Sequence, residues 1–349
     1  MNQLFRWDQM GLFLLALAAG ILPFTVSEVC AAALREGLTL CSGPLLLSLF
    51  PFLVVSRLLI QCPESDLLAL PFRLAAWGIG IRTPCAARVL CIGFLGGFAP
   101  AASAAAQAVR TGQLTAEEAD ALLPACICSG PSFVVLTVGQ SLLGSAELGV
   151  LLFASQITAN YLTAALLNRF AGVRSVKPGS AAPASPAPPR LDEILADAAI
   201  TYCKLCGFIL FFRMLAAGAG ALLPAGAGTL CAILLEVCSG CDLASRTGRW
   251  GSLLCCAALS VQGLSVLLQV RTICPPEMTL RPLYRARILH LPLSLALFYL
   301  LLPGGEADVF STLPARVLLM RRVPPDCALL VFCSVLYGSL HFAQWNPSS

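Results

Sequence analysis

The sequence predicts an all-α fold, a polytopic bundle with about eight to ten membrane segments, arranged as two related halves with discontinuous helices. Three observations predict it. Of the 349 residues, 58% are hydrophobic and only 11% are charged, whereas a soluble domain carries roughly 25% charged residues. Apolar segments recur along the chain, and several contain glycine and proline near their middle. A proline-rich stretch separates two parts that share short similar runs.

The N-terminal region, residues 1–40, is expected to form the first membrane helix. Its apolar run covers residues 11–34 and continues beyond the short core of a cleaved signal peptide. We therefore expect a retained helix rather than a removed leader.

The first half, residues 41–170, contains two apolar segments that are broken in the middle. Gly97 and Pro100 interrupt residues 85–109, and Gly130-Pro131 interrupts residues 121–143. Proline removes a backbone donor and glycine weakens a helix, so both segments should be discontinuous. Unpaired backbone groups at membrane depth are tolerated only beside protein or water, which makes broken helices typical of transporter binding sites. Kinks in ordinary membrane helices are the alternative.

The remaining elements of this half are expected to be a span at residues 43–60, an interfacial or re-entrant segment at 67–81 and a span at 148–167. Between the broken segments, Thr115-Ala-Glu-Glu118 predicts a capping box and thus a helix start. Glu117 and Asp120 are interpreted as solvated acids of that first turn.

Residues 171–190, with five prolines among Ala, Ser and Gly, are expected to form an extended linker. The second half, residues 191–303, should contain spans at 191–217, 221–241, 253–273 and 289–302. Residues 304–349 should form an interfacial segment and a last, C-terminal helix. Lysine and arginine occur in nearly every loop, so charge does not decide the orientation.

Short runs recur between the halves. The run FLVVSRLL, which contains Arg57, parallels FILFFRML, which contains Arg213, and Gly130-Pro-Ser parallels Gly263-Leu-Ser. Related halves with breaks at matching positions are typical of secondary transporters. Chance similarity among apolar helices is the alternative.

Candidate substrate-binding residues are polar side chains in apolar segments or residues at the breaks: Glu236, Gly240, Gln262, Gly263, Ser265, Gln269, Gly97, Pro100, Ser129, Gly130, Pro131, Asn160, Arg57 and Arg213. An acid at membrane depth indicates function, although Glu236 could also end a segment in headgroup water. Gln262, Ser265 and Gln269 should share a helix face that either joins helices or lines a cavity.

The two matching arginines have two interpretations as well. Arg57 and Arg213 could extend to the membrane surface on their long side chains. They could also form a symmetric inward pair that holds an anion or pairs with Glu236.

The chain is not expected to be an enzyme or to bind a cofactor, metal or nucleic acid. It lacks HExxH, GxSxG and Walker A motifs. Most of the 17 cysteines lie in apolar runs, and the two CxxC pairs have no histidine nearby. The net charge of +4 is spread over loops rather than clustered. An intramembrane hydrolase, the remaining enzyme class, would need His290 beside a serine.

Several runs carry a resemblance to a known family. They are Glu236 with Gly240, GLSVLLQV at residues 263–270, PLYRARILH at 282–290, GQLTAEEA at 112–119 and Gly130-Pro-Ser-Phe133. Over residues 45–302 the chain resembles the YlbJ-type sporulation integral membrane proteins. These belong to a wider group with Gate or nucleoside-recognition domains, so residues 41–170 and 191–303 would be two Gate-like halves.

The chain departs from the family pattern in the first half. Gly97-Phe-Ala-Pro100-Ala stands where the family has Gly-Tyr-Pro-x-Gly, Ile127 and Cys128 replace polar residues, and Asn160 replaces a histidine. The first-half site should therefore be less polar than is usual in the family, and the second-half signature is the stronger one.

The resemblance implies a multi-pass cell-membrane protein of an endospore-forming bacterium, located in the mother-cell or forespore membrane and needed for spore envelope or cortex formation. We expect a permease-like protein that moves an unidentified small solute without ATP. Its partners would be the lipid bilayer, that solute and other sporulation membrane proteins. The alternative is a non-transporting scaffold for sporulation proteins.

Overall fold

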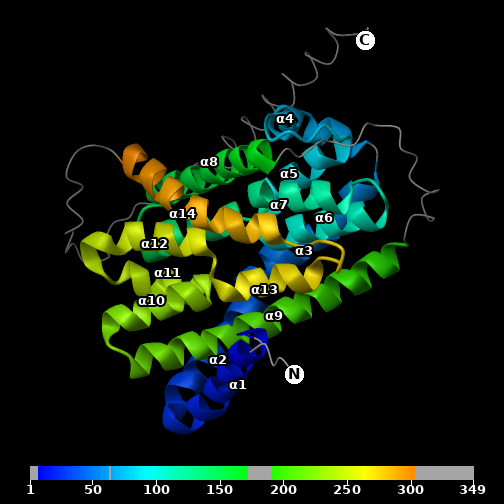
Figure 1. Cartoon of the computed structure of the whole chain (residues 1–349). Coiled ribbons are helices and arrows are strands. Elements are labelled where there is room, and N and C mark those ends of the chain that lie inside the picture. The colour runs from blue at the N-terminus through cyan, green and yellow to red at the C-terminus, as the bar shows by residue number, and fades with distance from the viewer. Residues whose placement is uncertain (1–6, 63, 172–189, 303–349) are drawn as a thin grey trace, which may run out of the picture.

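The computed structural model describes residues 7–62, 64–171 and 190–302, and these form helices without any strand (Figure 1). The first part contains α1 Trp7–Thr25, α2 Ser27–Ser42, α3 Pro44–Gln61, α4 Ser65–Gly78, α5 Pro84–Gly96, α6 Phe98–Arg110, α7 Ala116–Cys126, the π-helix η1 Ser132–Leu142 and α8 Ala146–Ala171. The second contains α9 Leu191–Leu222, α10 Ala225–Leu235, α11 Val237–Ser245, the 3₁₀ turn η2 Gly248–Trp250, α12 Gly251–Val261, α13 Gly263–Ile273 and α14 Arg281–Leu301.

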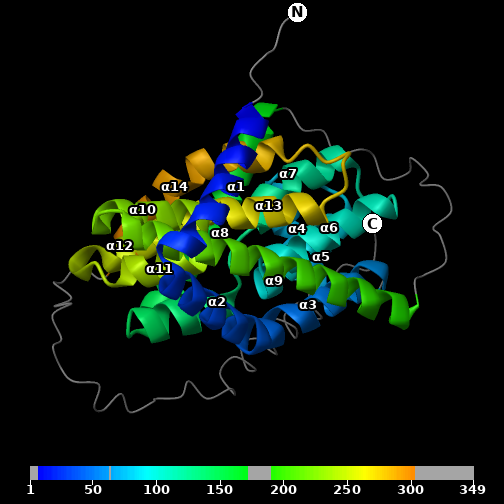
Figure 2. The same ribbon diagram turned by 90° about the horizontal axis from the view of Figure 1, so that it is seen from below.

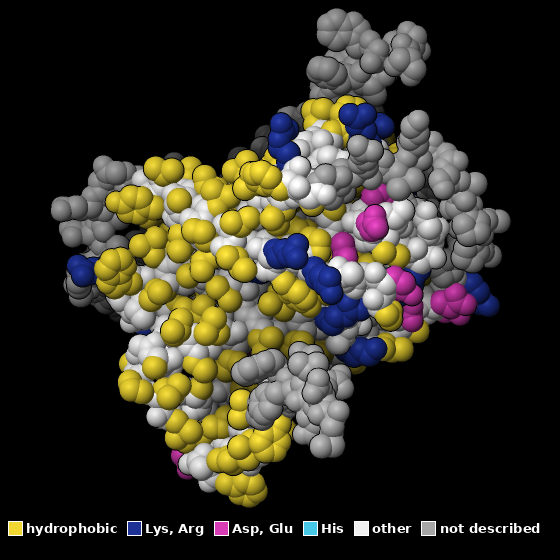
Figure 3. All heavy atoms as spheres, viewed as in Figure 1, with side chains coloured by type: hydrophobic (Ala, Val, Ile, Leu, Met, Phe, Trp, Pro, Cys, Tyr) yellow, Lys and Arg dark blue, Asp and Glu magenta, His cyan; other side chains and the backbone are white. Residues whose placement is uncertain are grey.

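The chain is a helical membrane protein. Its described part holds four helical stretches long and apolar enough to cross a membrane: Ser27–Gln61, Ala146–Ala171, Leu191–Leu222 and Gly248–Ile273. Shorter apolar helices accompany them, and most are halves of the broken segments. In Figure 3 apolar side chains cover the left of the molecule, over α10 and α12, and charged ones gather toward the right. The total of eight to ten membrane segments stays a prediction.

The N-terminal region is two helices rather than the single helix expected for residues 1–40. α1 ends at Thr25 and α2 begins at Ser27, because Val26 leaves the helical conformation (φ −135°, ψ 49°). The Thr25 hydroxyl donates to the carbonyls of Ile21 and Leu22, which gives the last turn of α1 a local partner. A side chain bonded in this way often bends a helix. α1 and α2 extend below α9 in Figure 1.

Among the described residues of the two halves, four helices are interrupted, two in residues 41–170 and two in residues 191–302. The breaks predicted at Gly97 and Gly130-Pro131 are present: Gly97 separates α5 from α6, and residues 127–131 separate α7 from η1. In the second half Glu236 separates α10 from α11, and Gln262 separates α12 from α13. Each break ends one short helix and starts another within a few residues. The descent of two halves from one repeat stays a prediction.

The interrupted helices lie between two longer elements. On one side α9 packs against α2, α3, α10 and α13, and on the other α8 packs against α14, which also contacts α7 and α12. Figure 1 and the view from below in Figure 2 show α9 running along the bundle as a long diagonal. Within the bundle α6 is mostly buried alanine. Such small residues let neighbouring helices approach closely.

The capping box predicted at the start of α7 is confirmed, but the interpretation of Asp120 as a solvated acid is wrong. The backbone N–H of Glu118 donates to the Thr115 hydroxyl, and that of Thr115 donates to the Glu118 carboxylate, both at 3.1 Å. Asp120 is buried and accepts hydrogen bonds from Thr279 and Leu280. Glu117 is exposed, as expected. The predicted linker and the segments in residues 304–349 lie outside the described residues, apart from the linker's two ends.

Candidate functional site

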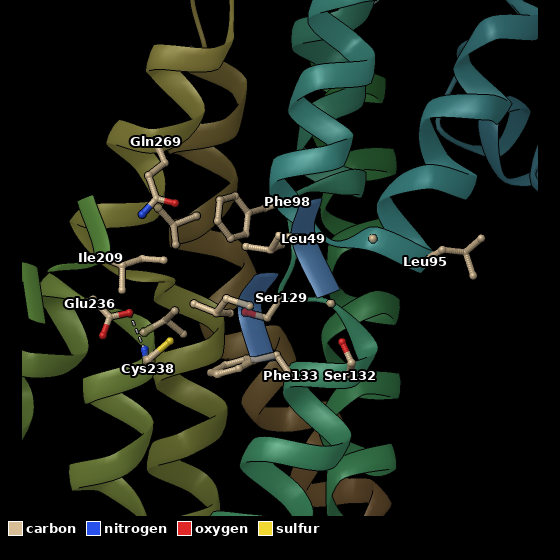
Figure 4. Close-up of a pocket in the computed structure, with 15 residues that line it drawn as sticks. Leu49, Leu95, Phe98, Ser129, Ser132, Phe133, Ile209, Glu236, Cys238 and Gln269 are labelled. Carbon is tan, nitrogen blue, oxygen red and sulfur yellow. Dashed lines mark hydrogen bonds between the residues drawn. The ribbon is translucent and has the colours of Figure 1, made fainter. Parts of the chain in front are cut away.

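A cavity of about 60 Å³ lies where the helix interruptions meet (Figure 4). Three of the four breaks contribute to its wall directly, and α13 contributes two side chains from beyond the fourth. Leu49, Phe98, Phe133 and Ile209 make most of the wall apolar. A water molecule needs roughly 15 Å³ of such volume, so the cavity has room for about four waters. It is a small pocket lined by residues of both halves.

Glu236 supplies the negative charge of this cavity. Its carboxylate accepts hydrogen bonds from the backbone N–H groups of Cys238 at 2.8 Å and Ser239 at 2.7 Å, and from the Ser239 hydroxyl at 2.9 Å. It thereby caps α11, whose positive end stabilises the anion. The residue is 2% exposed and forms none of the ion pairs found in the described residues. The charge therefore lies in the interior, whereas Asp242 pairs with Arg246 at the surface.

Gln269 lies on the wall across from Ser129 and carries an unsatisfied polar atom (Figure 4). Its Nε2 donates to the Ser265 hydroxyl at 2.9 Å, while its Oε1 is buried without a partner. A buried acceptor without a donor costs about 1–3 kcal/mol unless a ligand or water supplies one. Gln269 is therefore a natural point for a bound molecule to donate a hydrogen bond.

Gln262 does not share a helix face with Ser265 and Gln269, contrary to the prediction. It has a left-handed backbone (φ 62°) at the break between α12 and α13, so the helical spacing does not continue through it. Its side chain does not line the cavity and donates to the carbonyl of Ile127 at 3.4 Å. Gln262 thus joins the second half to the break in the first.

Two glycines allow the breaks within each half to touch backbone to backbone. At Gly97 (φ 80°) an added Cβ would lie 2.7 Å from the nitrogen of Gly130. At Gly263 (φ 71°) it would lie 2.8 Å from the nitrogen of Glu236. Both positions need glycine for the backbone angle and for the close approach. In each part of the chain, the glycine of one break thus lies directly against the other break.

Other predicted residues surround the cavity without all reaching it. Ser129 and Gly130 line it. Pro100 lies in the first turn of α6, and Pro131 precedes η1, so both shape the breaks. Gly240 lets α11 pack on α10, since a Cβ there would lie 2.8 Å from the Cα of Ile233. Pro100, Pro131 and Gly240 are better explained by packing than by direct binding.

A second polar cluster lies beside the cavity and centres on Arg287 of α14. Arg287 donates from Nη2 to the carbonyl of Ile127 at 3.0 Å and to Oδ1 of Asn160 at 3.3 Å, and from Nη1 to the carbonyl of Ser260 at 3.3 Å. Asn160 also donates to the carbonyl of Ile127, at 3.2 Å. The guanidinium is buried, and none of the ion pairs among the described residues includes it.

Arg57 and Arg213 do not form an inward pair. Arg57 pairs with Asp197 of α9 at 2.5 Å, and Arg213 pairs with Glu36 of α2 at 2.7 Å. Neither lines the cavity. The predicted alternative in which Arg213 pairs with Glu236 is therefore wrong, because a nearer acid on a neighbouring helix takes the guanidinium. The two pairs join α9 to the N-terminal helices.

The sequence carried a signal for the Arg287 cluster that was not used as a site prediction. Arg287, His290 and Ser294 are spaced by three and four residues on α14, and all three are buried. That spacing marks one helix face. His290 bonds to the carbonyl of Gln156 at 3.2 Å rather than to a serine hydroxyl. The described residues contain no group of three metal-binding side chains.

Comparisons of the chain with family models, curated proteins and solved structures found no match.

Proposed function

We propose that the chain is a permease-like membrane protein that moves a small solute through the cavity that three of the four helix breaks line. The observation that carries the proposal is the convergence of the breaks on a pocket walled by a buried carboxylate and a buried amide. Discontinuous helices around a polar mid-membrane site are the common architecture of secondary transporters. A scaffold has no need for such a pocket.

The chemistry of the wall indicates the class of solute. Glu236 and Gln269 present acceptor oxygens, and the remaining wall is largely apolar. A matching solute is small, neutral or cationic, and has at least one hydrogen-bond donor beside an apolar part. The cavity is too small for most metabolites as it stands, so the short helices must separate to admit one. That movement corresponds to alternating access, and it uses no ATP.

The biological setting in this proposal comes from the resemblance to YlbJ-type proteins. The solute would cross the mother-cell or forespore membrane during spore envelope or cortex formation. A comparison of metabolites on the two sides of the forespore membrane, with and without the protein, tests this setting independently of the residues of the cavity.

Replacing Glu236 with glutamine should abolish most transport while the protein stays folded. The amide keeps one acceptor oxygen for the cap of α11 but loses the charge, and a charged hydrogen bond contributes about 1.5–3 kcal/mol. We therefore expect uptake to fall roughly ten- to a hundred-fold. The measurement is uptake from a mixed metabolite extract by liposomes containing the purified full chain, with mass spectrometry of the contents. Gln269→Leu should also lose uptake.

The matched control is Asp242→Asn, which removes an acid from the surface of the same helix. It should retain normal uptake. Equal uptake by wild type and Glu236→Gln would reject the site. Identical contents in liposomes with and without the protein would favour the scaffold.

A further inference from the structure

Arg287 is a cation in the interior whose described partners are all neutral oxygen atoms. These are the carbonyls of Ile127 and Ser260 and the amide oxygen of Asn160, at 3.0–3.3 Å. A buried arginine normally has a carboxylate beside it, because an unpaired buried charge is costly. For Arg287, the cost of burying the charge must therefore be offset by the dipoles of neutral groups.

Those dipoles belong to two half-helices, one from each half of the chain. Ile127 is the C-cap residue that directly follows α7, and Ser260 lies in the last turn of α12. The last carbonyls of a helix lack partners within the helix and form its negative end. Arg287 therefore bridges the negative ends of two short helices that meet beside the cavity.

In transporters with discontinuous helices, unwound carbonyls and the C-terminal ends of half-helices hold the coupling cation. We propose that Arg287 is a tethered cation that fills this position, and that it holds α7 and α12 together without an inorganic ion. The inference rests on the proposed permease function and deepens it. Because Arg287 fills the cation position, no Na⁺ binds there, and transport by this chain does not depend on a Na⁺ gradient through that position.

The surroundings of Arg287 exclude two other roles. An anion bound at Nη1 and Nη2 is disfavoured because the oxygens that accept from these atoms would repel it, although Nε is buried without a hydrogen-bond partner among the described residues. An extension to the membrane surface is excluded because the side chain is buried among α7, α8 and α12. The guanidinium is thus a positioning group for the two half-helices.

The test is thermal unfolding of the purified full chain in detergent, followed with a dye that reacts with newly exposed thiols, since many cysteines are buried. Arg287→Ala should lower the midpoint by about 5–10 °C, because it leaves helix-end carbonyls without their cation. Low millimolar guanidinium, far below denaturing concentrations, should restore part of this loss in the alanine variant and not in the wild type. Arg287→Lys should remain close to the wild type.

Two further variants show whether the stability of the protein depends on the charge of the side chain at position 287 or only on its volume. Arg287→Met fills a similar space without charge and should be destabilised and insensitive to guanidinium. Arg285→Ala, at an exposed position on the same helix, should melt like the wild type. If Arg287→Ala does not fold at all, the comparison of the lysine and methionine variants decides.

Three results would overturn the proposal. They are a methionine variant as stable as the wild type, an alanine variant that folds but gains nothing from guanidinium, and a wild-type midpoint that rises specifically with Na⁺ at constant ionic strength. None of these measurements requires transport to be observed. Their failure is therefore distinguishable from a failure of the proposed function, which the Glu236→Gln uptake experiment addresses.

Discussion

Replacing Gly263 with alanine should destabilise the protein by about 2–5 kcal/mol. The residue has a φ of 71°, and a left-handed conformation costs an alanine about 1–2 kcal/mol. The new methyl group would also lie 2.8 Å from the nitrogen of Glu236 and 2.9 Å from the carbonyl carbon of Leu235. Both are backbone atoms that cannot rotate away, and overpacking of this kind costs about 1–3 kcal/mol more. The midpoint of thermal unfolding in detergent checks this.

Gly144 is the matched control for this prediction. It has nearly the same φ, 73°, but nothing lies within 4 Å of the position a Cβ would take. Gly144→Ala should therefore cost only the conformational part, about 1–2 kcal/mol. Gly97→Ala should behave like Gly263→Ala, because its methyl group would meet the backbone of Gly130. Equal midpoints for the Gly263 and Gly144 variants would mean that the close approach of the two breaks contributes nothing.

These contacts show which part of the site could be predicted from sequence. Glycine and proline in an apolar run mark the first-half breaks directly, because they weaken or block the helix locally. The breaks at Glu236 and Gln262 have no proline. They depend on a side-chain cap at Glu236 and on a left-handed glutamine, which tertiary contacts impose. For this reason the prediction from helical spacing is wrong for Gln262. The same spacing correctly places Ser265 next to Gln269.

Charged residues were harder to interpret because their partners lie far away in the sequence. Arg57 pairs with Asp197, 140 residues later, and Arg213 pairs with Glu36, 177 residues earlier. Composition and periodicity carry no information on such distances. For the same reason, the sequence alone does not identify Arg287 as a site residue. Its partners at the ends of two helices become neighbours only when the two halves pack together. Local rules therefore located the two breaks of the first half, while long-range packing decided which polar side chains surround them.

Asp120→Ala is expected to destabilise the protein by about 1–3 kcal/mol, although the nearby Glu117 should tolerate the same change. The Asp120 carboxylate accepts hydrogen bonds from the N–H and hydroxyl of Thr279, at 2.8 and 2.7 Å, and from the N–H of Leu280 at 3.1 Å. The N–H of Leu280 is buried and would be left without a partner, which costs about 1–3 kcal/mol, whereas Thr279 is exposed and its donors can bond to water instead. Leu280 also has a left-handed backbone (φ 56°), which this acceptor helps to hold.

This carboxylate fixes the entry to α14, the helix that carries Arg287, against α7 of the first half. Loss of the carboxylate should lower the midpoint of thermal unfolding and weaken the contact between the halves. Asp120→Asn keeps one acceptor oxygen, so its midpoint should lie between those of Asp120→Ala and the wild type. The check is the same thiol-dye melting curve for Asp120→Ala, Asp120→Asn and the exposed control Glu117→Ala. If Asp120→Ala and Glu117→Ala melt together, Asp120 is not the anchor of α14, and the position of Arg287 must depend on the packing of α14 against α7, α8 and α12.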